Sequence, residues 1–189
     1  GPDGMPPHDA EAEAGALDEW RERARPLLQQ MPSDAGAANL LAEVDRLLEP
    51  LGEQLRGRAS GERGHTAPHR NIGPIHRDLH DKQIMWDPVG GPGLLDVDTA
   101  CRGERELDLG NLRAHARWRI EQDLWTPAEA AAVIDEIARA TSSAGLDAER
   151  VAVFERATLV RLVCVYAFRP PWRGRLGRLL ETARDLTGC

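Results

Sequence analysis

The sequence predicts a mainly α-helical domain that carries one small β-hairpin. Apolar residues recur at helical spacing on both sides of the middle of the chain, most clearly over residues 37–55. Two short apolar runs, at residues 84–86 and 93–95, flank a segment rich in Asp, Pro and Gly, which is typical of a hairpin. A chain of 189 residues is long enough to bury a sizeable core around these elements.

The N-terminal part divides into a tail and the first helices. Residues 1–16 are rich in Gly, Pro, Ala and acidic residues, so we expect a flexible tail or a remnant of an expression tag, followed by one domain over residues 17–189. Within residues 37–55 one helical face is apolar, and Pro50 is expected to kink or end that helix. A polar, glycine-rich loop is expected over residues 57–73.

The segments after the hairpin are predicted to be almost wholly helical. Residues 126–129, Thr-Pro-Ala-Glu, match a capping box with proline at the first helical position, which predicts a helix over residues 127–142. Asp147 is expected to cap the next helix. Residues 170–171, Pro-Pro, should separate that helix from a last one that starts near Trp172.

Composition excludes several classes of protein. The net charge of −7 argues against general affinity for nucleic acid, although arginine supplies 23 of the 24 basic residues. The chain contains no apolar run of the roughly 20 residues that a membrane span needs, and no signal peptide is recognisable. The three cysteines, Cys101, Cys164 and Cys189, are scattered and lack metal-ligand spacing. We therefore expect a cytoplasmic protein with no membrane and no nucleic-acid partner.

Two acidic clusters flank the predicted hairpin, at residues 76–83 (His-Arg-Asp-Leu-His-Asp-Lys-Gln) and 94–98 (Leu-Leu-Asp-Val-Asp). A hairpin returns the chain on itself, so these clusters should lie side by side. Phosphoryl transfer needs a carboxylate that accepts the proton of the attacking hydroxyl, and oxygen ligands for magnesium. Asp78 is the candidate proton acceptor, and Asp96 and the amide oxygen of Gln83 are candidate magnesium ligands.

These motifs, together with Gly-Glu-Arg-Glu-Leu-Asp-Leu-Gly-Asn-Leu at residues 103–112, resemble the C-terminal lobe of the aminoglycoside phosphotransferase and choline kinase-like family. Its members are small-molecule kinases of protein-kinase-like α+β fold. The resemblance implies that Asp78 is the catalytic base and that Gln83 and Asp96 bind magnesium. It also implies that His76 braces the loop that carries the base, and that Asp108 caps a helix beneath the site. The implied cofactors are Mg²⁺ and ATP or another nucleoside triphosphate.

The sequence departs from the family pattern in three respects. Gln83 stands where Asn is the usual metal ligand, and Arg77 stands where the antibiotic kinases more often have Gly, which gives a His-Arg-Asp triplet as in protein kinases. A kinase of this fold also needs an N-terminal lobe of strands, with a loop over the phosphates and a lysine that pairs with them. No strand-rich segment precedes His76, and Lys82 is the only lysine. We therefore expect a C-terminal lobe without its N-terminal lobe.

Several neighbouring residues have two readings. His80 could contact substrate or phosphate, or be a buried histidine bonded to the loop. Lys82 could approach the transferred phosphate, or be an exposed loop lysine. Asp98 could act in catalysis, or bind backbone amides at the end of the hairpin. His76, Asp78 and His80 alternate along the chain and would share one face of a strand, as ligands of a metal hydrolase could.

Three hypotheses of function follow from these residues. The first is an ATP-dependent phosphotransferase that transfers the γ-phosphate to a hydroxyl of a small molecule of aminoglycoside, sugar or amino-alcohol type, and that needs an N-lobe absent from this sequence. The second is a pseudokinase-like binding module that has lost turnover. The third is a lone C-lobe that catalyses phosphate elimination or metal-assisted hydrolysis with the same acidic residues.

Besides the substrate, we expect a partner that covers the face against which an N-lobe would pack. Without an N-lobe, the face near Ile75 and Leu94 would be exposed, and an apolar surface in water favours association. A separate N-lobe chain, or a second copy of this chain, is the expected occupant.

Overall fold

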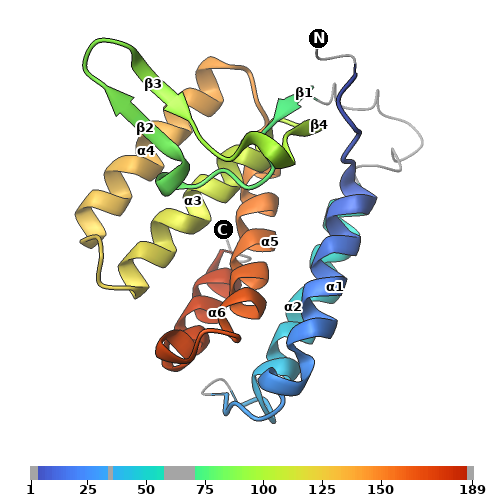
Figure 1. Ribbon diagram of the computed structural model, residues 1–189. Helices are drawn as coiled ribbons and strands as arrows, with labels where there is room; N and C mark the ends of the chain where they lie inside the picture. The colour runs from blue at the N-terminus through green and yellow to red at the C-terminus, as the bar shows by residue number, and fades with distance from the viewer. Residues whose placement is uncertain (1–3, 34–35, 58–70, 187–189) are drawn as a thin grey trace.

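The computed structural model describes residues 4–33, 36–57 and 71–186. Most of the described residues are helical, as the sequence predicts, and the strands are short (Figure 1). The helices are α1 (Ala10–Leu28), α2 (Leu40–Gly57), α3 (Glu106–Glu121), α4 (Pro127–Ser143), α5 (Ala148–Tyr166) and α6 (Leu176–Asp185). The strands are β1 (Ile72–Ile75), β2 (Ile84–Asp87), β3 (Gly91–Leu94) and β4 (Cys101–Glu104). Short 3₁₀ helices are η2 (Asp81–Gln83), η3 (Val97–Thr99) and η4 (Pro170–Arg175).

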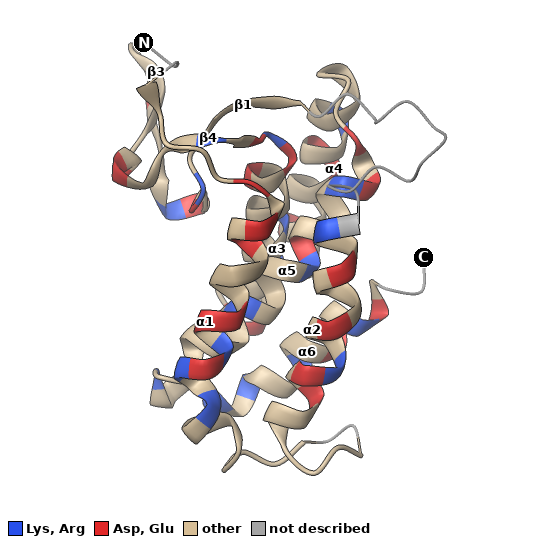
Figure 2. Cartoon of the chain, turned by 90° about the vertical axis from the view of Figure 1, so that its right-hand side faces the viewer, with Lys and Arg blue, Asp and Glu red and all other residues tan. Residues whose placement is uncertain are grey.

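The predicted hairpin is confirmed as the antiparallel pair β2–β3, in which Ile84 lies opposite Leu94. Asp87 forms the turn, because its Oδ1 atom accepts the backbone N–H groups of Val89 at 2.9 Å and Gly90 at 2.6 Å. Gly91 follows with φ 82°, a conformation that glycine adopts at little cost. The hairpin projects from the helices in both views of the chain (Figures 1 and 2).

A second antiparallel pair, β1–β4, was not predicted. It joins Ile72 to Glu104 and Ile75 to Cys101, and β1 begins at the end of the segment expected to be a loop. Residues near the N-terminus extend this pair, since the His8 N–H donates to the carbonyl of Arg102 at 2.8 Å. These pairings join segments far apart in sequence, so no local sequence pattern predicts them.

The first helix begins earlier than the sequence analysis expected. Asp9 caps α1 by accepting the N–H of Ala12 at 2.9 Å, and the helix starts at Ala10, so the boundary expected at residue 16 falls inside it. Alanine has the strongest helix propensity, and acidic residues in a first turn favour a helix. Glu13 is buried and lies 2.7 Å from His8. Residues 10–16 are therefore a packed helix and not a flexible tail.

Pro50 does not end α2, so this part of the expectation that it would kink or end the helix is wrong. The helix continues past it to Gly57. Pro50 is exposed, so the backbone group that loses its partner can face water, while Leu51 and Leu55 beyond it are buried. Packing of the apolar face thus outweighs the local cost of proline.

The helices after the hairpin match the predictions closely. The capping box is present: the Thr126 hydroxyl accepts the N–H of Glu129 at 3.2 Å, and the Glu129 carboxylate accepts the N–H of Thr126 at 2.7 Å. The helix that follows ends at Ser143, one residue beyond the expected Ser142. Asp147 caps α5 as expected. The Pro-Pro segment begins η4, and α6 starts at Leu176 instead of near Trp172.

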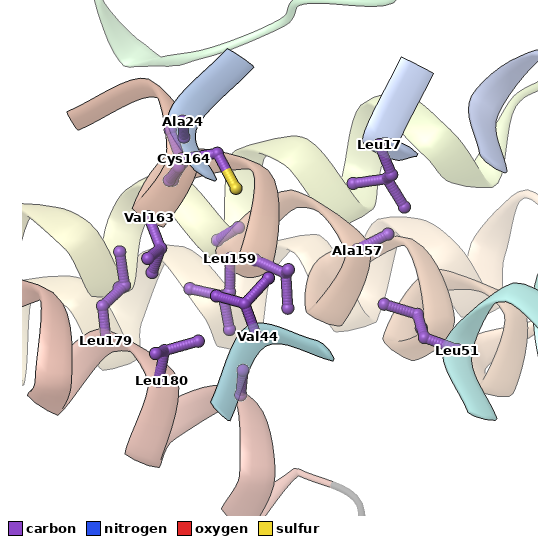
Figure 3. Packing of buried hydrophobic residues seen from close by; sticks show 14 of the residues in the cluster. Leu17, Ala24, Val44, Leu51, Ala157, Leu159, Val163, Cys164, Leu179 and Leu180 are labelled. Atoms are coloured by element: carbon purple, nitrogen blue, oxygen red, sulfur yellow. The ribbon is translucent and has the colours of Figure 1, made fainter. Parts of the chain in front are cut away.

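Helix α5 lies at the centre of the core, packed against α1, α2, α3 and α6. Figure 3 shows its side chains between those of α1, α2 and α6; the labelled residues are Leu17, Ala24, Val44, Leu51, Ala157, Leu159, Val163, Cys164, Leu179 and Leu180. All of them are buried. None of the helices in the part of the chain that the structure describes is both long and apolar enough to span a bilayer.

Buried ion pairs add specific connections to α5. Glu155 is fully buried and lies 2.8 Å from Nε of Arg113 and 2.6 Å from Nε of Arg117, both on α3. Arg150 donates to Glu104 of β4 at 2.8 Å. Removing one partner of such a pair leaves an uncompensated buried charge, so these contacts fix how α3 and β4 sit on α5.

The outer surfaces of α1 and α2 carry both signs of charge, interspersed along each helix (Figure 2). Arg21 of α1 lies 2.8 Å from Asp45 of α2, and Arg56 of α2 lies 3.0 Å from Glu11 of α1. Exposed pairs of this kind each contribute at most about 1 kcal/mol. The apolar contacts beneath them therefore hold the two helices to the core.

We expect Gly110→Ala to destabilise the protein by about 1–3 kcal/mol, because α3 and α5 touch at this residue. A Cβ atom at Gly110 would lie 2.6 Å from Cβ of Phe154 and 2.7 Å from the backbone nitrogen of Glu155. Chemical denaturation would measure the loss. Gly15→Ala in α1 is the control, since its added Cβ meets no atom within 4 Å. It should be neutral or stabilising by up to about 1 kcal/mol. Equal effects of the two substitutions would contradict the close approach of α3 and α5.

Candidate active site

The loop of residues 76–80 joins β1 to η2 and carries Asp78. Its backbone is held by Asp108, whose carboxylate accepts the N–H of His76 at 2.7 Å and the N–H of Arg77 at 2.9 Å. The expectation that Asp108 caps a helix beneath the site is wrong, because its carboxylate binds the loop instead. Arg105 occupies the N-cap position of α3, and Asp108 lies in the first turn. The first turn of a helix favours a negative charge, and here that charge binds the loop above the helix.

Two further side chains hold the same loop. The Asn111 side chain donates to the carbonyl of Arg77 at 2.7 Å, and the Thr99 hydroxyl donates to the carbonyl of His76 at 2.9 Å. Arg77 has φ 72°, a left-handed conformation that costs a non-glycine residue about 1–3 kcal/mol. Such a residue persists only where its surroundings over-determine it. These hydrogen bonds supply that constraint, and strained backbone of this kind is concentrated at functional sites.

His76 connects the loop to the end of the hairpin. Its side chain is buried, and its Nε2 atom lies 2.7 Å from the carbonyl oxygen of Leu95, the residue before Asp96. The ring therefore occupies a position from which it can brace the loop, as the sequence analysis expects. The same contact sets the loop beside the segment that carries Asp96.

Gln83 and Asp96 lie together at the base of the hairpin. The amide nitrogen of Gln83 lies 3.4 Å from Oδ2 of Asp96, and the N–H of Leu95 donates to the backbone carbonyl of Gln83 at 2.9 Å. Gln83 is buried, and its Oε1 atom has no hydrogen-bond partner within the described residues. Asp96 is exposed, with φ 58°, a conformation that aspartate tolerates better than most residues.

This pair of residues fits a magnesium ion. Mg²⁺ prefers oxygen ligands and is usually held by one or two protein side chains together with water and phosphate oxygens. A buried acceptor without a partner is costly unless something else binds it. The amide oxygen of Gln83 is such an acceptor, and the amide nitrogen of the same side chain contacts the exposed carboxylate of Asp96.

The 3₁₀ helix that carries Gln83 is anchored from below by Arg119 of α3. Arg119 is only 2% exposed, and its guanidinium donates to Asp81 from Nε at 3.0 Å and from Nη2 at 2.7 Å. The N–H of Gln83 donates to the carbonyl of His80 at 3.0 Å. A bidentate contact of this kind fixes both position and orientation. Arg119 thus determines where η2 presents Gln83.

A pocket of about 350 Å³ lies beside Asp78. It is lined by the 76–80 loop and by α1, α3 and α5; the residues are Trp20, Arg77, Asp78, His80, Thr99, His115, Arg161, Leu162, Val165, Tyr166 and Arg169. Its volume is at the small end of the range for small-molecule sites. A slightly larger hollow, of about 400 Å³, lies between α1 and α2, but none of the predicted site residues line it. The pocket at Asp78 is therefore the better candidate for a substrate.

Two histidines stack at the inner wall of this pocket. The rings of His80 and His115 are 4.8 Å apart and tilted by 37°. Burial lowers the pKa of His80, and it lowers the pKa of His115 well below its ordinary value. Both rings are therefore neutral near pH 7. His80 is half-buried in the wall of the pocket, and its role stays a prediction.

Lys82 and Asp98 are exposed, and neither forms a hydrogen bond or ion pair with another predicted site residue in the described ranges. Their roles stay predictions.

The alternative of a metal hydrolase finds no support, because no three His, Cys, Asp or Glu side chains among the described residues form a group that could hold a metal ion. His76, one of the three candidate ligands of that alternative, instead has its ring Nε2 atom at hydrogen-bond distance from the carbonyl oxygen of Leu95.

Sequence reasoning missed several residues that build the site. Asn111 lies within the motif at residues 103–112, so its hydrogen-bonding amide could have been singled out there. His115 and Arg119 follow on the same helical face, at intervals of four residues, and this spacing was the available signal. Arg161 of α5 lies 3.9 Å from Asp78, and no local pattern marks it.

The fold and the site together define a mainly helical domain that presents a carboxylate on a loop held by several hydrogen bonds, near an amide and a second carboxylate suited to magnesium. The chain belongs to the phosphotransferase enzyme family (APH), whose model matches residues 7–153. None of the curated proteins matches the sequence of the chain.

Two solved structures share the fold. A glucosamine kinase superposes with a TM-score of 0.61 at 19% identity, over 98% of this chain and 48% of that one. An ethanolamine kinase from Plasmodium vivax superposes with a TM-score of 0.51 at 14% identity, over 93% of this chain and 48% of that one. The chain thus spans about half the length of each. At such identities the likeness concerns the fold alone.

We expect Asp108→Ala to destabilise the protein by about 2–4 kcal/mol, because two N–H groups of the loop lose a charged acceptor. Burial raises the pKa of Asp108, so part of the gain is offset by the cost of burying its charge. Asp135→Ala, at an exposed position of α4, is the matched control and should change stability by less than about 0.5 kcal/mol. Thermal and urea unfolding would compare the two. A loss no greater than that of the control would show that the loop does not depend on Asp108.

Stability should also fall as the pH falls below about 6.5. The unfolded chain takes up a proton on His115 in that range, but the folded protein does not, because burial lowers the pKa of this residue. The contribution is at most about 1.4 kcal/mol per pH unit. Urea unfolding between pH 7.5 and about 5.5 would measure it. His115→Gln should show a shallower slope over that range, and identical slopes in the two proteins would contradict this account.

Proposed function

We propose that the chain is the catalytic lobe of an ATP-dependent phosphotransferase that transfers the γ-phosphate to a hydroxyl group of a small molecule. One observation carries the proposal. Gln83 contacts Asp96 through its amide nitrogen and has a buried amide oxygen without a partner, and the hydrogen bond between His76 and Leu95 sets both residues next to the loop that holds Asp78. Membership of the phosphotransferase family supports the same reading.

In the proposed reaction the substrate binds in the pocket with one hydroxyl next to Asp78. The hydroxyl oxygen forms a bond to the γ-phosphorus while the bond from that phosphorus to the bridging oxygen breaks. The proton of the hydroxyl passes to the Asp78 carboxylate, and the leaving group is the nucleoside diphosphate. Arg161, at 3.9 Å from Oδ1 of Asp78, helps to hold this carboxylate in place.

The nucleotide phosphates would lie over the base of the hairpin. Gln83 and Asp96 would hold Mg²⁺, which neutralises charge on the phosphates as it develops. Lys82 is exposed in the same segment and is long enough to approach a phosphate. His76, Asp108 and Asn111 act through the backbone, because each holds the loop and none of them lines the pocket.

We further propose that a nucleotide-binding lobe covers the hairpin. Trp86 is 73% exposed, Met85 52% and Leu94 55%, so the hairpin presents large apolar side chains on a surface that projects from the helices. Exposed apolar patches of this kind mark interfaces. The chain spans 48% of each kinase it resembles, which leaves room for such a lobe, on the same polypeptide or on a separate one. Association of two copies through this face is the other arrangement.

Calorimetric titration of the chain with ATP, with and without magnesium, tests the proposal. We expect magnesium-dependent binding, weakened at least about tenfold in Asp96→Ala and unchanged in Asp135→Ala. With a nucleotide-binding lobe of the family added, phosphate transfer to hydroxyl compounds should fall about 10²–10⁴-fold in Asp78→Asn.

The other outcomes separate the alternatives. A pseudokinase-like module would be indicated if ligand affinity depended neither on magnesium nor on Asp96 and if no phosphate transfer occurred under any condition. Turnover of a phosphorylated compound without nucleotide would indicate elimination or hydrolysis. Absence of both ATP binding by the chain and transfer in the presence of the added lobe would contradict the proposal.

A further inference from the structure

The pocket beside Asp78 is basic, although the protein as a whole carries a net charge of −7. Among its lining residues, Asp78 is the only carboxylate, whereas Arg77, Arg161 and Arg169 are all cations. We propose that the hydroxyl substrate is an anion, such as a sugar acid or a hydroxycarboxylic acid, with its negative group held by Arg77 and Arg169. This inference rests on the proposed function, since it concerns the acceptor site of that reaction.

The charge of Arg161 is largely compensated inside the protein. One end of its guanidinium lies 3.9 Å from Asp78, and the other lies 4.0 Å from the buried carboxylate of Glu13. Its Nη2 atom also donates to the side chain of Asn111 at 3.1 Å. Arg161 is therefore a positioning residue for Asp78, and it contributes little net charge to a ligand.

Arg169 has no such compensation, and that of Arg77 is only partial: Arg77 helps to lower the pKa of Glu13, after burial, which raises it, and after His8 and Arg161, which lower it more. Neither guanidinium lies within ion-pair distance of a carboxylate in the part of the chain that the structure describes. Arg169 is placed by Tyr166, because its guanidinium lies 5.3 Å from the centre of that ring. Arg77 is placed by the strained backbone of the loop. Two cations without a carboxylate at ion-pair distance make a site that attracts an anion.

The remaining walls suit a hydroxylated carbon skeleton. Trp20, Leu162 and Tyr166 offer apolar and aromatic surface from α1 and α5. His115 is only 7% exposed, and its Nδ1 atom has no hydrogen-bond partner among the described residues. A buried polar atom without a partner is expected to bind a ligand or water.

An amine substrate fits this pocket poorly. The solved structures of similar fold are named as kinases of glucosamine and of ethanolamine, which both carry an amino group. An ammonium group needs a carboxylate or an aromatic cage free of competing cations. Here Asp78 is the single carboxylate of the lining, and the proposed reaction uses it for the proton of the hydroxyl. Arg169 already occupies the face of Tyr166.

A matched series of pyranoses tests the inference without nucleotide or magnesium. Calorimetric titration of the whole chain would compare glucuronate, glucose and glucosamine, which differ mainly in charge. We expect glucuronate to bind at least about tenfold more tightly than the other two, and this preference to shrink as salt is added. Arg169→Gln should remove the preference. Arg139→Gln, a substitution of an exposed arginine on α4 outside the pocket, should retain it.

The inference would be overturned if glucosamine or glucose bound as tightly as glucuronate, if glucuronate did not bind at tens of millimolar, or if Arg169→Gln kept the preference. Each of these results leaves the phosphotransferase proposal standing, because that proposal is judged by magnesium-dependent ATP binding and by transfer. Conversely, an anion preference without any ATP binding would support an anion-binding pocket and weaken the proposed reaction.

Discussion

The arrangement of the site depends on one carboxylate. Asp108 binds the backbone of His76 and Arg77 from the first turn of α3, and so fixes a loop whose left-handed Arg77 would otherwise relax. Burial of Asp108 costs free energy, as the rise in its pKa shows, and the two N–H donors offset part of that cost. The orientation of Asp78 within the pocket follows from this contact, because Asp78 is the next residue along the loop.

Helix α3, which carries Asp108, also holds the other parts of the site. Asp108, Asn111, His115 and Arg119 are spaced by three, four and four residues, so they lie along one face of the helix. In order, they hold the loop backbone, hold the carbonyl of Arg77, line the pocket and anchor η2. The opposite side of α3 packs on α5 through Gly110 and the Arg113–Glu155 pair. Because α3 is packed against the core, the side chains that it presents to the site are held in fixed positions.

The apolar hairpin β2–β3 and the basic pocket beside Asp78 differ in chemistry, so they suit different binding partners. The hairpin exposes Met85 and Trp86, which suits a protein surface. The pocket places cations around a single carboxylate, which suits a small anion. The chain spans about half of each kinase of similar fold, and under the proposed function this lobe would bind its acceptor alone and share its nucleotide with a second lobe.

The sequence by itself determined the elements whose causes are local. The Asp87 turn, the Thr126 capping box and the Asp147 cap each depend on neighbours within a few residues, and a hairpin necessarily brings Gln83 near Asp96. Only the tertiary structure decided the β1–β4 pairing, the path of α2 through Pro50, and the roles of Arg119 and Arg161. These features arise from contacts between residues distant in the chain. Their free energy comes from burial and from paired charge, and neither is encoded in a local pattern.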